Sequence, residues 1–352
     1  MEIKRSSKRI INSLLSVSLT AGILLSSFPA FVHATVKLPK SITLNYGDKY
    51  VLNTNIKKNN LKSANPKIAS ITVKGKIRAK KPGKTVVTAK IRGKTYKIKV
   101  RVRTLLVAHR GFSSAYPENT LEGFSAAVKN GFDGIECDVW ESKNGDIMVA
   151  HDAGLKRTTR KNGFIWKVNR KNRSKFPIVR GKGIEKFKGK KLLIPSLQEV
   201  VRFVKKHKCR LMLHIKSKGS YGYKPSSKGI KKIIKIIKKY KIKTRTTIFA
   251  RSKKILKLCI GNDIRLAALV TPKSKTDLLK NILWCRKKGV KNIVLLSFDD
   301  LKKKFTVKKV AKLMKSNGLK YGIYTAVTRS QYKTLLKNGA DFAISDYQLR
   351  SK

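Results

Sequence analysis

The chain has 352 residues, and its 84 Lys and Arg against 18 Asp and Glu give a formal net charge of +66. Hydrophobic residues make up 41% of the sequence, which supports a sizeable core and excludes a wholly disordered chain. The charge predicts binding to polyanions through counterion release. The sequence contains no nucleic-acid-binding fold pattern and no basic motif interleaved with aromatic residues, so we expect no specific nucleic-acid binding.

Residues 1–34 have the pattern of a secretory signal peptide. The basic stretch "KRSSKR" precedes an uncharged apolar run, and the tripeptide "VHA" that ends at Ala34 resembles a cleavage site. An uncleaved membrane anchor is the alternative, which the many serines and Pro29 disfavour. No other stretch is long and apolar enough to span a bilayer. We therefore predict that the protein is secreted and extracellular, and that its basic charge retains it at the cell envelope.

Residues 35–103 have the pattern of a small all-β domain. Short strand-like runs alternate with the turn signals "YGD", "KPG" and "RGK", and the closing run "YKIKVRV" alternates apolar and basic residues, as a half-buried strand does. The pieces "YGDKYVL", "SANPKIASI" and "GKIRAKKPGKTVVTAKI" resemble the bacterial group 2 immunoglobulin-like domains. The resemblance implies an immunoglobulin-like β-sandwich that serves as an extracellular spacer or adhesive module and carries no catalysis.

From residue 104 onward, strands alternate with helices. The strand-like runs are "TLLVAH", "GIECDVW", "CRLMLHIK", "TRTTIFA", "IRLAALV", "KNIVLLSF", "KYGIYTAV" and "ADFAISD". Helical patterns separate them over 119–130, 196–207, 227–240, 251–260, 275–288, 306–317 and 329–338. In the stretch 227–240, isoleucines occupy one face and lysines the other. This alternation over about 250 residues predicts an α/β fold, a (β/α)8 TIM-type barrel over 104–352.

Polar side chains gather at the ends of the first three predicted barrel strands, where such barrels concentrate function. These residues, together with a histidine that follows the turn after the second strand, are His109, Arg110, Glu136, Asp138, His151, His214 and Lys216. Residues i and i+2 of a strand share a face, so Glu136 and Asp138 point together, and so do His214 and Lys216. The region 118–152 also holds eight of the 18 acidic residues.

These residue types indicate metal-assisted phosphoester cleavage. Paired carboxylates inside an apolar run are costly unless a cation joins them, and a hard divalent cation with oxygen ligands fits the pair. His109 and His151 are suited to act as a general acid and base. Arg110 and Lys216 are suited to hold an anionic group such as a phosphate.

The stretch "VAHRGFSSAYPENTLEGFSAAVKNGFDGIECDVWESKNGDIMVAHDAGLKRTT" is similar to the opening of the glycerophosphodiester phosphodiesterases. The pieces "IPSLQEVV", "LMLHIK", "YGIYTAV" and "GADFAISDY" extend the resemblance over about residues 105–349. The resemblance implies a barrel that hydrolyses glycerophosphodiesters to an alcohol and glycerol phosphate. The substrate would be either a small deacylated phospholipid or a glycerol-phosphate polymer of the envelope.

The same resemblance implies roles for individual residues. His109 and His151 would form the acid/base pair, and Arg110 would bind phosphate. Glu136 and Asp138 would bind a Ca²⁺ or Mg²⁺ ion. The segment 152–195, defined here as the insertion, would lie over the site.

Two positions depart from the family's pattern. His214 stands where the third strand usually carries a metal-binding Glu, while Lys216 is retained. We expect His214 to ligate the metal and, because imidazole suits transition metals, to shift the preference towards Mn²⁺ or Zn²⁺. Tyr324-Thr325 replaces a usual Trp-Thr pair, a change that would affect how the substrate's glycerol packs.

The cysteines and the remaining histidine have structural interpretations. Cys137, Cys209, Cys259 and Cys285 each lie in an apolar context, so we predict buried free thiols. A bridge between Cys259 and Cys285 remains open. His207, at a helix end, is expected on the surface.

Three alternatives to this interpretation remain open. The two carboxylates could pair with bases such as Lys216 in a structural ion network. The His214 change could mark a barrel that has lost catalysis and binds anionic cell-wall polymer or a membrane surface. A related phospholipase acting on lysolipid or phosphoinositide headgroups would need a more apolar rim. The sequence does not predict the oligomeric state.

Overall fold

The computed structural model describes residues 38–45, 47–52, 61–91, 93–217, 223–299 and 305–350. The predicted signal peptide, residues 1–34, lies outside these described residues. Within them, no helix combines the length and the apolar character that a membrane crossing requires.

Two small sheets form in the described part of residues 38–103. One has the strand order β1-β7-β6-β3 and the other has the order β2-β5-β4. The strands are β1 (Ser41–Asn45), β2 (Lys49–Val51), β3 (Leu61–Ser63), β4 (Ala69–Ile71), β5 (Lys76–Ala79), β6 (Gly83–Ile91) and β7 (Lys94–Arg103). In β7, Ile98, Val100 and Val102 are buried and the bases between them are exposed, as the alternation predicts. The assignment to the immunoglobulin-like domains stays a prediction.

The predicted (β/α)8 barrel is confirmed. In the described chain, eight parallel strands pair in the order β9-β11-β12-β13-β14-β15-β16-β8, and the pairing of β8 with β9 closes the ring. They are β8 (Leu105–Ala108), β9 (Gly134–Glu141), β11 (Arg210–Ile215), β12 (Thr246–Ala250), β13 (Arg265–Val270), β14 (Asn292–Leu296), β15 (Lys320–Tyr324) and β16 (Phe342–Ser345). A further strand, β10 (Ile147–Val149), runs antiparallel to β9 after the turn at Asn144 and Gly145.

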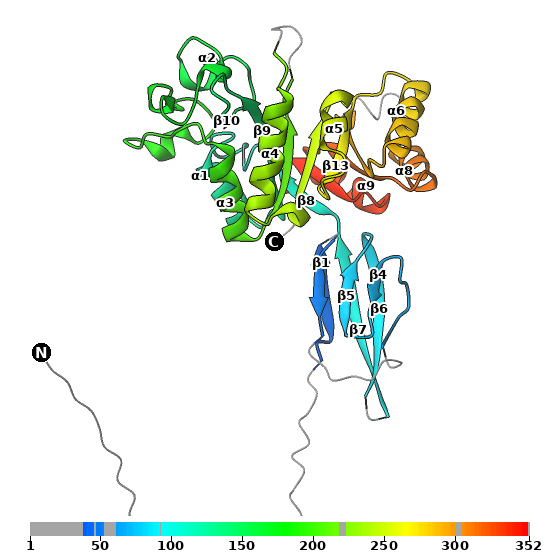
Figure 1. Cartoon of the computed structure of the whole chain (residues 1–352). Helices are drawn as coiled ribbons and strands as arrows, with labels where there is room; N and C mark the ends of the chain where they lie inside the picture. Colours follow the sequence, from blue (N-terminus) through cyan, green and yellow to red (C-terminus); the bar gives the residue numbers. More distant parts are fainter. Residues whose placement is uncertain are drawn as a thin grey trace, which may run out of the picture. The chain divides into compact units, whose positions relative to one another are not determined.

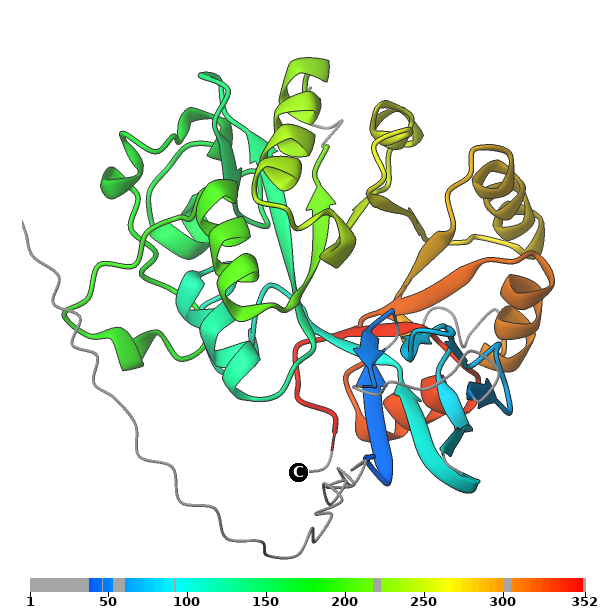
Figure 2. The ribbon, with the colours of Figure 1, turned by 60° about the horizontal axis from the view of Figure 1, so that its bottom comes forward.

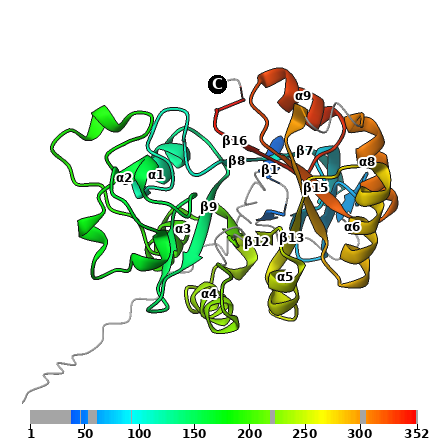
Figure 3. The same cartoon turned by 90° about the horizontal axis from the view of Figure 1, so that it is seen from above.

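Helices surround the strands, as the view from above shows (Figure 3). They are α1 (Leu121–Lys129), α2 (Lys156–Thr159), α3 (Leu197–His207), α4 (Ser227–Lys239), α5 (Lys253–Cys259), α6 (Lys275–Lys287), α8 (Val307–Ser316) and α9 (Arg329–Lys337). All except the short α2 match the predicted helical stretches to within two residues at either end. In α4, Ile230, Ile233 and Ile237 face the core while Lys231 and Lys235 are exposed.

Each barrel strand presents one face to the helices and the other to the barrel interior. In β9, Ile135, Cys137 and Val139 belong to the apolar layer between the strands and the helices. Glu136 and Asp138 alternate with them, and both are fully buried. The barrel interior is otherwise apolar at the level of Val107, Met212 and Phe249 in the neighbouring strands. The two carboxylates therefore stand inside a largely apolar barrel.

The insertion leaves the barrel after β10 and returns at α3, and it carries little regular structure (green in Figures 1 and 2). Apart from α2, it contains the short 3-10 turns η2 (Ile165–Lys167), η3 (Arg173–Lys175) and η4 (Ile184–Phe187). Its own apolar cluster includes Leu155, Ile165 and Leu192, which pack with Trp140 of β9. The insertion is thereby anchored beside the end of β9.

All four cysteines are buried and free, as predicted, so Cys259 and Cys285 do not form a disulfide in this structure. Burial raises the pKa of Cys259 and of Cys285 to about 12, so both thiols stay protonated at neutral pH. His207 is exposed near the end of α3, as expected.

Candidate active site

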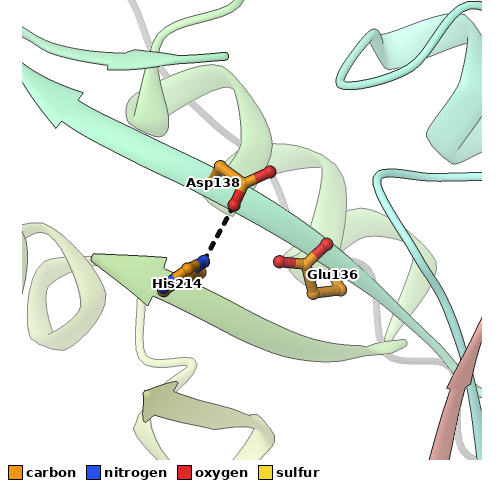
Figure 4. A group of neighbouring side chains, drawn as sticks. All are labelled: Glu136, Asp138 and His214. Atoms are coloured by element: carbon orange, nitrogen blue, oxygen red, sulfur yellow. Dashed lines mark hydrogen bonds and ion pairs between the residues drawn. The ribbon is translucent and has the colours of Figure 1, made fainter. Parts of the chain in front are cut away.

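Glu136, Asp138 and His214 come together on two neighbouring strands (Figure 4). Asp138 of β9 lies opposite His214 of β11 in the strand register. The two side chains meet across the strands, with His214 Nδ1 2.9 Å from Asp138 Oδ1. Glu136 points to the same face because it lies two residues before Asp138. The register of adjacent parallel strands thus assembles the group.

This group fits a divalent cation. Each of the three residues offers one ligand atom, and these atoms lie within 4.8 Å of one another. Two metal–ligand bonds of about 2.0–2.6 Å span such a separation. Glu136 Oε1 is also buried without a hydrogen-bond partner among the described residues. A buried carboxylate oxygen without a donor is costly, and a bound cation would remove that cost.

The electrostatics differ between the three residues. Burial, and then the nearby Asp138 carboxylate, raise the pKa of Glu136 well above its usual value. Burial also acts to raise the pKa of Asp138, but Lys216 and His214 outweigh it and hold that pKa well below the usual value. Burial lowers the pKa of His214 to about 4, against the opposing effect of Asp138. At neutral pH His214 is therefore an uncharged imidazole, the form that binds metals.

Both predicted phosphate-binding bases lie against these carboxylates. Lys216 Nζ is 3.4 Å from Asp138 Oδ1, and Arg110 Nε is 3.7 Å from Asp138 Oδ2. The Arg110 backbone N–H donates to Glu136 Oε2 at 3.0 Å. The ion pair that we weighed as a structural alternative, Asp138 with Lys216, is thus present in the structure. The contacts of Lys216 and Arg110 with Asp138 place both bases beside the three-residue group.

The loop after β8 brings a further residue to Asp138. Asn119 Nδ2 donates to Asp138 Oδ2 at 3.2 Å, and Asn119 Oδ1 accepts from the Asp138 backbone N–H at 3.3 Å. Asn119 has a φ of 55°, a left-handed conformation that Asn tolerates better than most residues. Gly111 in the same loop has a φ of 83°, and a Cβ there would lie 2.8 Å from the Gly123 backbone. The loop therefore needs glycine at that position to pack on α1.

His109 follows the end of β8 and is held by the carboxylate of Asp346, which follows the last strand, β16. His109 Nδ1 is 2.7 Å from Asp346 Oδ1, an oxygen that also accepts from Ser113 Oγ at 2.6 Å. The Tyr324 ring meets the His109 ring edge-on, with centroids 4.5 Å apart. His109 Nε2 is buried and has no hydrogen-bond partner among the described residues. One ring nitrogen is thus held while the other is open for proton transfer.

His151 lies between β10 and the first residue of the insertion. His151 Nδ1 is 2.6 Å from Asp152 Oδ1. Asp152 Oδ2 in turn accepts from Arg157 Nε at 2.5 Å. The residue that precedes His151, Ala150, donates its backbone N–H to the Asp138 carbonyl oxygen at 3.1 Å. The second predicted histidine therefore also stands beside the three-residue group.

All seven sequence-predicted site residues thus lie at the same end of the barrel. The residues that the sequence did not single out are Asn119, Tyr324 as a partner of Arg110, Asp346, and the pair Glu118 and Arg157. Asp346 follows the end of β16, so the rule that placed the other site residues could have found it. The pairing of Glu118 with Arg157 joins two loops, and the sequence carries no local signal for it.

Comparison with known proteins yields one family model, described as the glycerophosphoryl diester phosphodiesterase family, that matches residues 109–349. A glycerophosphodiester phosphodiesterase from Caldanaerobacter subterraneus is 38% identical over 148 residues, which is 42% of this chain and 58% of that protein. A second from Bacillus altitudinis is 36% identical over 134 residues, 37% of this chain and 52% of its own length. The chain thus spans little more than half the length of these relatives.

Among solved structures, a phosphodiesterase from Oleispira antarctica in complex with the product sn-glycerol-3-phosphate is similar with a TM-score of 0.58. It is 21% identical, and the match covers 69% of this chain and 93% of that one. The glycerophosphodiester phosphodiesterase from Thermotoga maritima has a TM-score of 0.54 at 20% identity, covering 69% and 95% of the two chains. At this identity the two likenesses concern the barrel fold.

Proposed function

The chain belongs to the glycerophosphoryl diester phosphodiesterase family, and from this premise we propose that it is a metal-dependent hydrolase of glycerophosphodiesters. The reaction would yield an alcohol and glycerol phosphate. The relatives named as glycerophosphodiester phosphodiesterases support the reaction class. The solved relative that holds sn-glycerol-3-phosphate supports the same substrate chemistry.

One observation carries the proposal: the buried carboxylates Glu136 and Asp138, with one oxygen of Glu136 lacking a hydrogen-bond partner, occur in the same site as His109, whose Nε2 is also buried without a partner among the described residues. A purely structural ion network would satisfy its buried acceptors, whereas Glu136 Oε1 has no hydrogen-bond partner among the described residues. Likewise, a structural histidine in a core would have both ring nitrogens bonded, and His109 Nε2 is not. The arrangement therefore favours a catalytic site over the structural alternative.

In this proposal Glu136, Asp138 and His214 hold the cation. A divalent ion there would stabilise negative charge on the phosphate oxygens. Arg110 and Lys216 add positive charge at the same place and orient the phosphate. One of His109 and His151 would take a proton from the attacking water, whose oxygen forms the new bond to phosphorus, and the other would give a proton to the alcohol oxygen as its bond to phosphorus breaks. His109 and His151 each have a carboxylate at Nδ1, so each can present Nε2 for that transfer.

We further propose that the protein is secreted and is held at the envelope by its charge. The formal charge of +66 supports adhesion to anionic wall polymer or membrane surfaces. Exposed lysines on α4, such as Lys228, Lys231 and Lys238, are typical of that surface. A polymer of glycerol phosphate would combine both properties, because it is a polyanion and a chain of phosphodiesters.

The test is a phosphodiesterase assay of the purified chain on glycerophosphocholine, glycerophosphoglycerol and a polyglycerol phosphate. Each substrate is offered with EDTA and with Ca²⁺, Mg²⁺, Mn²⁺ and Zn²⁺ in turn. We expect turnover of at least one diester that EDTA abolishes and one of the metals restores. The same samples are run in low and high salt, where polymer binding should weaken steeply as salt rises.

Three results would contradict this proposal. Turnover that survives EDTA would exclude the metal role. Polymer binding without turnover of any diester would instead favour a binding protein whose barrel has lost catalysis, the alternative that the His214 substitution supports. Turnover of lysolipids in preference to glycerophosphodiesters would point to a phospholipase.

A further inference from the structure

Arg157 lies in the insertion at the centre of a continuous series of hydrogen bonds that joins two site residues, His151 and Arg110. Its Nε donates to Asp152 Oδ2 at 2.5 Å, and its two terminal nitrogens donate to Glu118 at 2.9 and 2.6 Å. Glu118 also accepts from Arg110 Nη1 at 3.3 Å. Asp152 accepts from His151. The order of contacts is therefore His151, Asp152, Arg157, Glu118, Arg110.

The two carboxylates in this series of contacts, Glu118 and Asp152, are both charged. Burial acts to raise the pKa of Glu118, but Arg157 and Arg110 outweigh it and hold the pKa below its usual value. The hydrogen bond from His151, and then that from Arg157, hold the pKa of Asp152 far below its usual value. Each carboxylate is thus shared between Arg157 and one site residue. Two ionised carboxylates repel each other, so Glu118 and Asp152 can lie close together only because the Arg157 guanidinium stands between them.

The geometry of the contacts requires an arginine. A guanidinium is a planar fork that donates from fixed directions, and here the Nε edge binds one carboxylate while the terminal nitrogens bind the other. A lysine at this position would keep the positive charge but would present a single point donor. It could not hold Asp152 and Glu118 at the same time in these orientations.

We propose that Arg157 is a positioning residue that sets the orientation and the tautomer of His151. Arg157 holds Asp152 in place, Asp152 accepts the Nδ1 proton of His151, and the imidazole then presents Nε2 to the substrate. Through Glu118, the same guanidinium joins the insertion to the loop that follows His109 and Arg110. The inference rests on the proposed phosphodiesterase function for its kinetic consequence, and on the geometry alone for the tautomer.

The exposure of these groups separates this role from a role in stability. The Arg157 side chain is 49% exposed and that of Asp152 is 35% exposed. Exposed ion pairs add little to folding stability. A shift of about 1 Å in a catalytic group, by contrast, can cost about 10²-fold in rate. Replacement of Arg157 should therefore lower the catalytic rate strongly while the free energy of unfolding changes little.

The chain offers a matched control in the same insertion. Arg173 donates to both Glu199 oxygens, at 2.5 and 2.9 Å, and ties the insertion to the start of α3. It is a two-oxygen arginine clamp like that of Arg157 on Glu118, but its hydrogen bonds within the described residues go to Ile194 and Glu199 and not to His151 or Asp152. Arg173→Lys therefore removes a comparable two-oxygen arginine–carboxylate contact without changing the contacts of His151.

The kinetic experiment compares Arg157→Lys, Arg173→Lys, His151→Ala and the double variant Arg157→Lys/His151→Ala in the full chain. With the diester that the wild type hydrolyses best, Arg157→Lys should lower kcat by about 10–10²-fold with little change in KM. In the His151→Ala background the same substitution should have almost no further effect. Arg173→Lys should leave kcat near that of the wild type.

A second measurement does not depend on turnover. In ¹⁵N-histidine NMR spectra, the wild-type His151 ring should show a proton on Nδ1, and Arg157→Lys should shift it towards a tautomer mixture. Arg173→Lys should leave the His151 signals unchanged. Arg157→Gln provides a second variant for both measurements if the lysine variant does not fold.

Three results would overturn the inference. The first is an equal loss from Arg157→Lys with and without His151. The second is a raised KM at unchanged kcat, which would show that Arg157 binds the substrate directly. The third is a His151 spectrum that does not respond to either Arg157 variant. If the wild type hydrolyses no diester, the proposed function fails, while the spectra still decide whether Arg157 positions His151.

Discussion

Replacement of Asp346 tests the structure more sharply than replacement of the histidines, because the sequence did not single it out. Asp346→Ala removes the acceptor 2.7 Å from His109 Nδ1. Burial acts to raise the pKa of Asp346, but the hydrogen bond from His109 outweighs it and keeps the pKa below its usual value. The carboxylate is therefore ionised at neutral pH and, if His109 takes up a proton in the proposed reaction, would stabilise the resulting positive charge.

The magnitude follows from what His109 can contribute. General acid–base catalysis supplies about 10²–10⁴-fold, or about 3–5 kcal/mol of the activation barrier. Asp346 acts through His109, so its removal cannot cost more than this. The Asp346 side chain is 31% exposed, and water can partly replace it as an acceptor. We therefore expect a loss near the lower end, about 10²-fold in kcat.

The assay is steady-state turnover of the preferred diester with saturating metal, with thermal unfolding as the check on folding. Ser113→Ala is the control, because Ser113 donates to the same carboxylate oxygen at 2.6 Å but does not bond His109. It should cost much less than Asp346→Ala. If Asp346→Ala kept near-wild-type turnover while His109→Ala lost it, the carboxylate would not orient His109 and the reasoning would be refuted.

Three further predictions concern the histidines, the metal and pH. His109→Ala and His151→Ala should each lower turnover by about 10²–10⁴-fold and leave circular dichroism unchanged; near-wild-type rates in both would remove the catalytic assignment. His214→Glu should raise the affinity for Ca²⁺ or Mg²⁺ measured by calorimetry, since a carboxylate suits hard cations better than imidazole; unchanged metal binding in His214→Ala would make His214 a bystander. Burial raises the pKa of Asp341 from 3.8 to about 6. Ionisation of Asp341 therefore destabilises the folded protein as pH rises from about 4 to above 6. Between pH 4 and pH 8, the free energy of unfolding of Asp341→Asn should rise by up to about 3 kcal/mol relative to that of the wild type. Denaturant unfolding at both pH values checks this, and a difference that does not vary with pH would contradict it.

The sequence by itself determined the features that depend on local periodicity. Alternation within β9 gave a shared face to Glu136 and Asp138, and the helical spacing of the isoleucines in α4 defined its buried side. The order of strands and helices determined the barrel, because parallel strands joined by helices close in few ways. The rule that barrel sites lie at strand ends then placed all seven predicted site residues at one end.

Only the tertiary structure decided which of these residues touch. Asp138 and His214 meet because the register of β9 and β11 sets them opposite each other, although they are 76 positions apart. His109 and Asp346 are 237 positions apart and meet because β8 and β16, the first and last strands of the barrel, pair directly and close the ring. No local pattern encodes such a contact, since it arises from strand pairing across the whole domain. The clamp of Arg157 on Glu118 likewise exists only once the insertion has folded back onto the first loop.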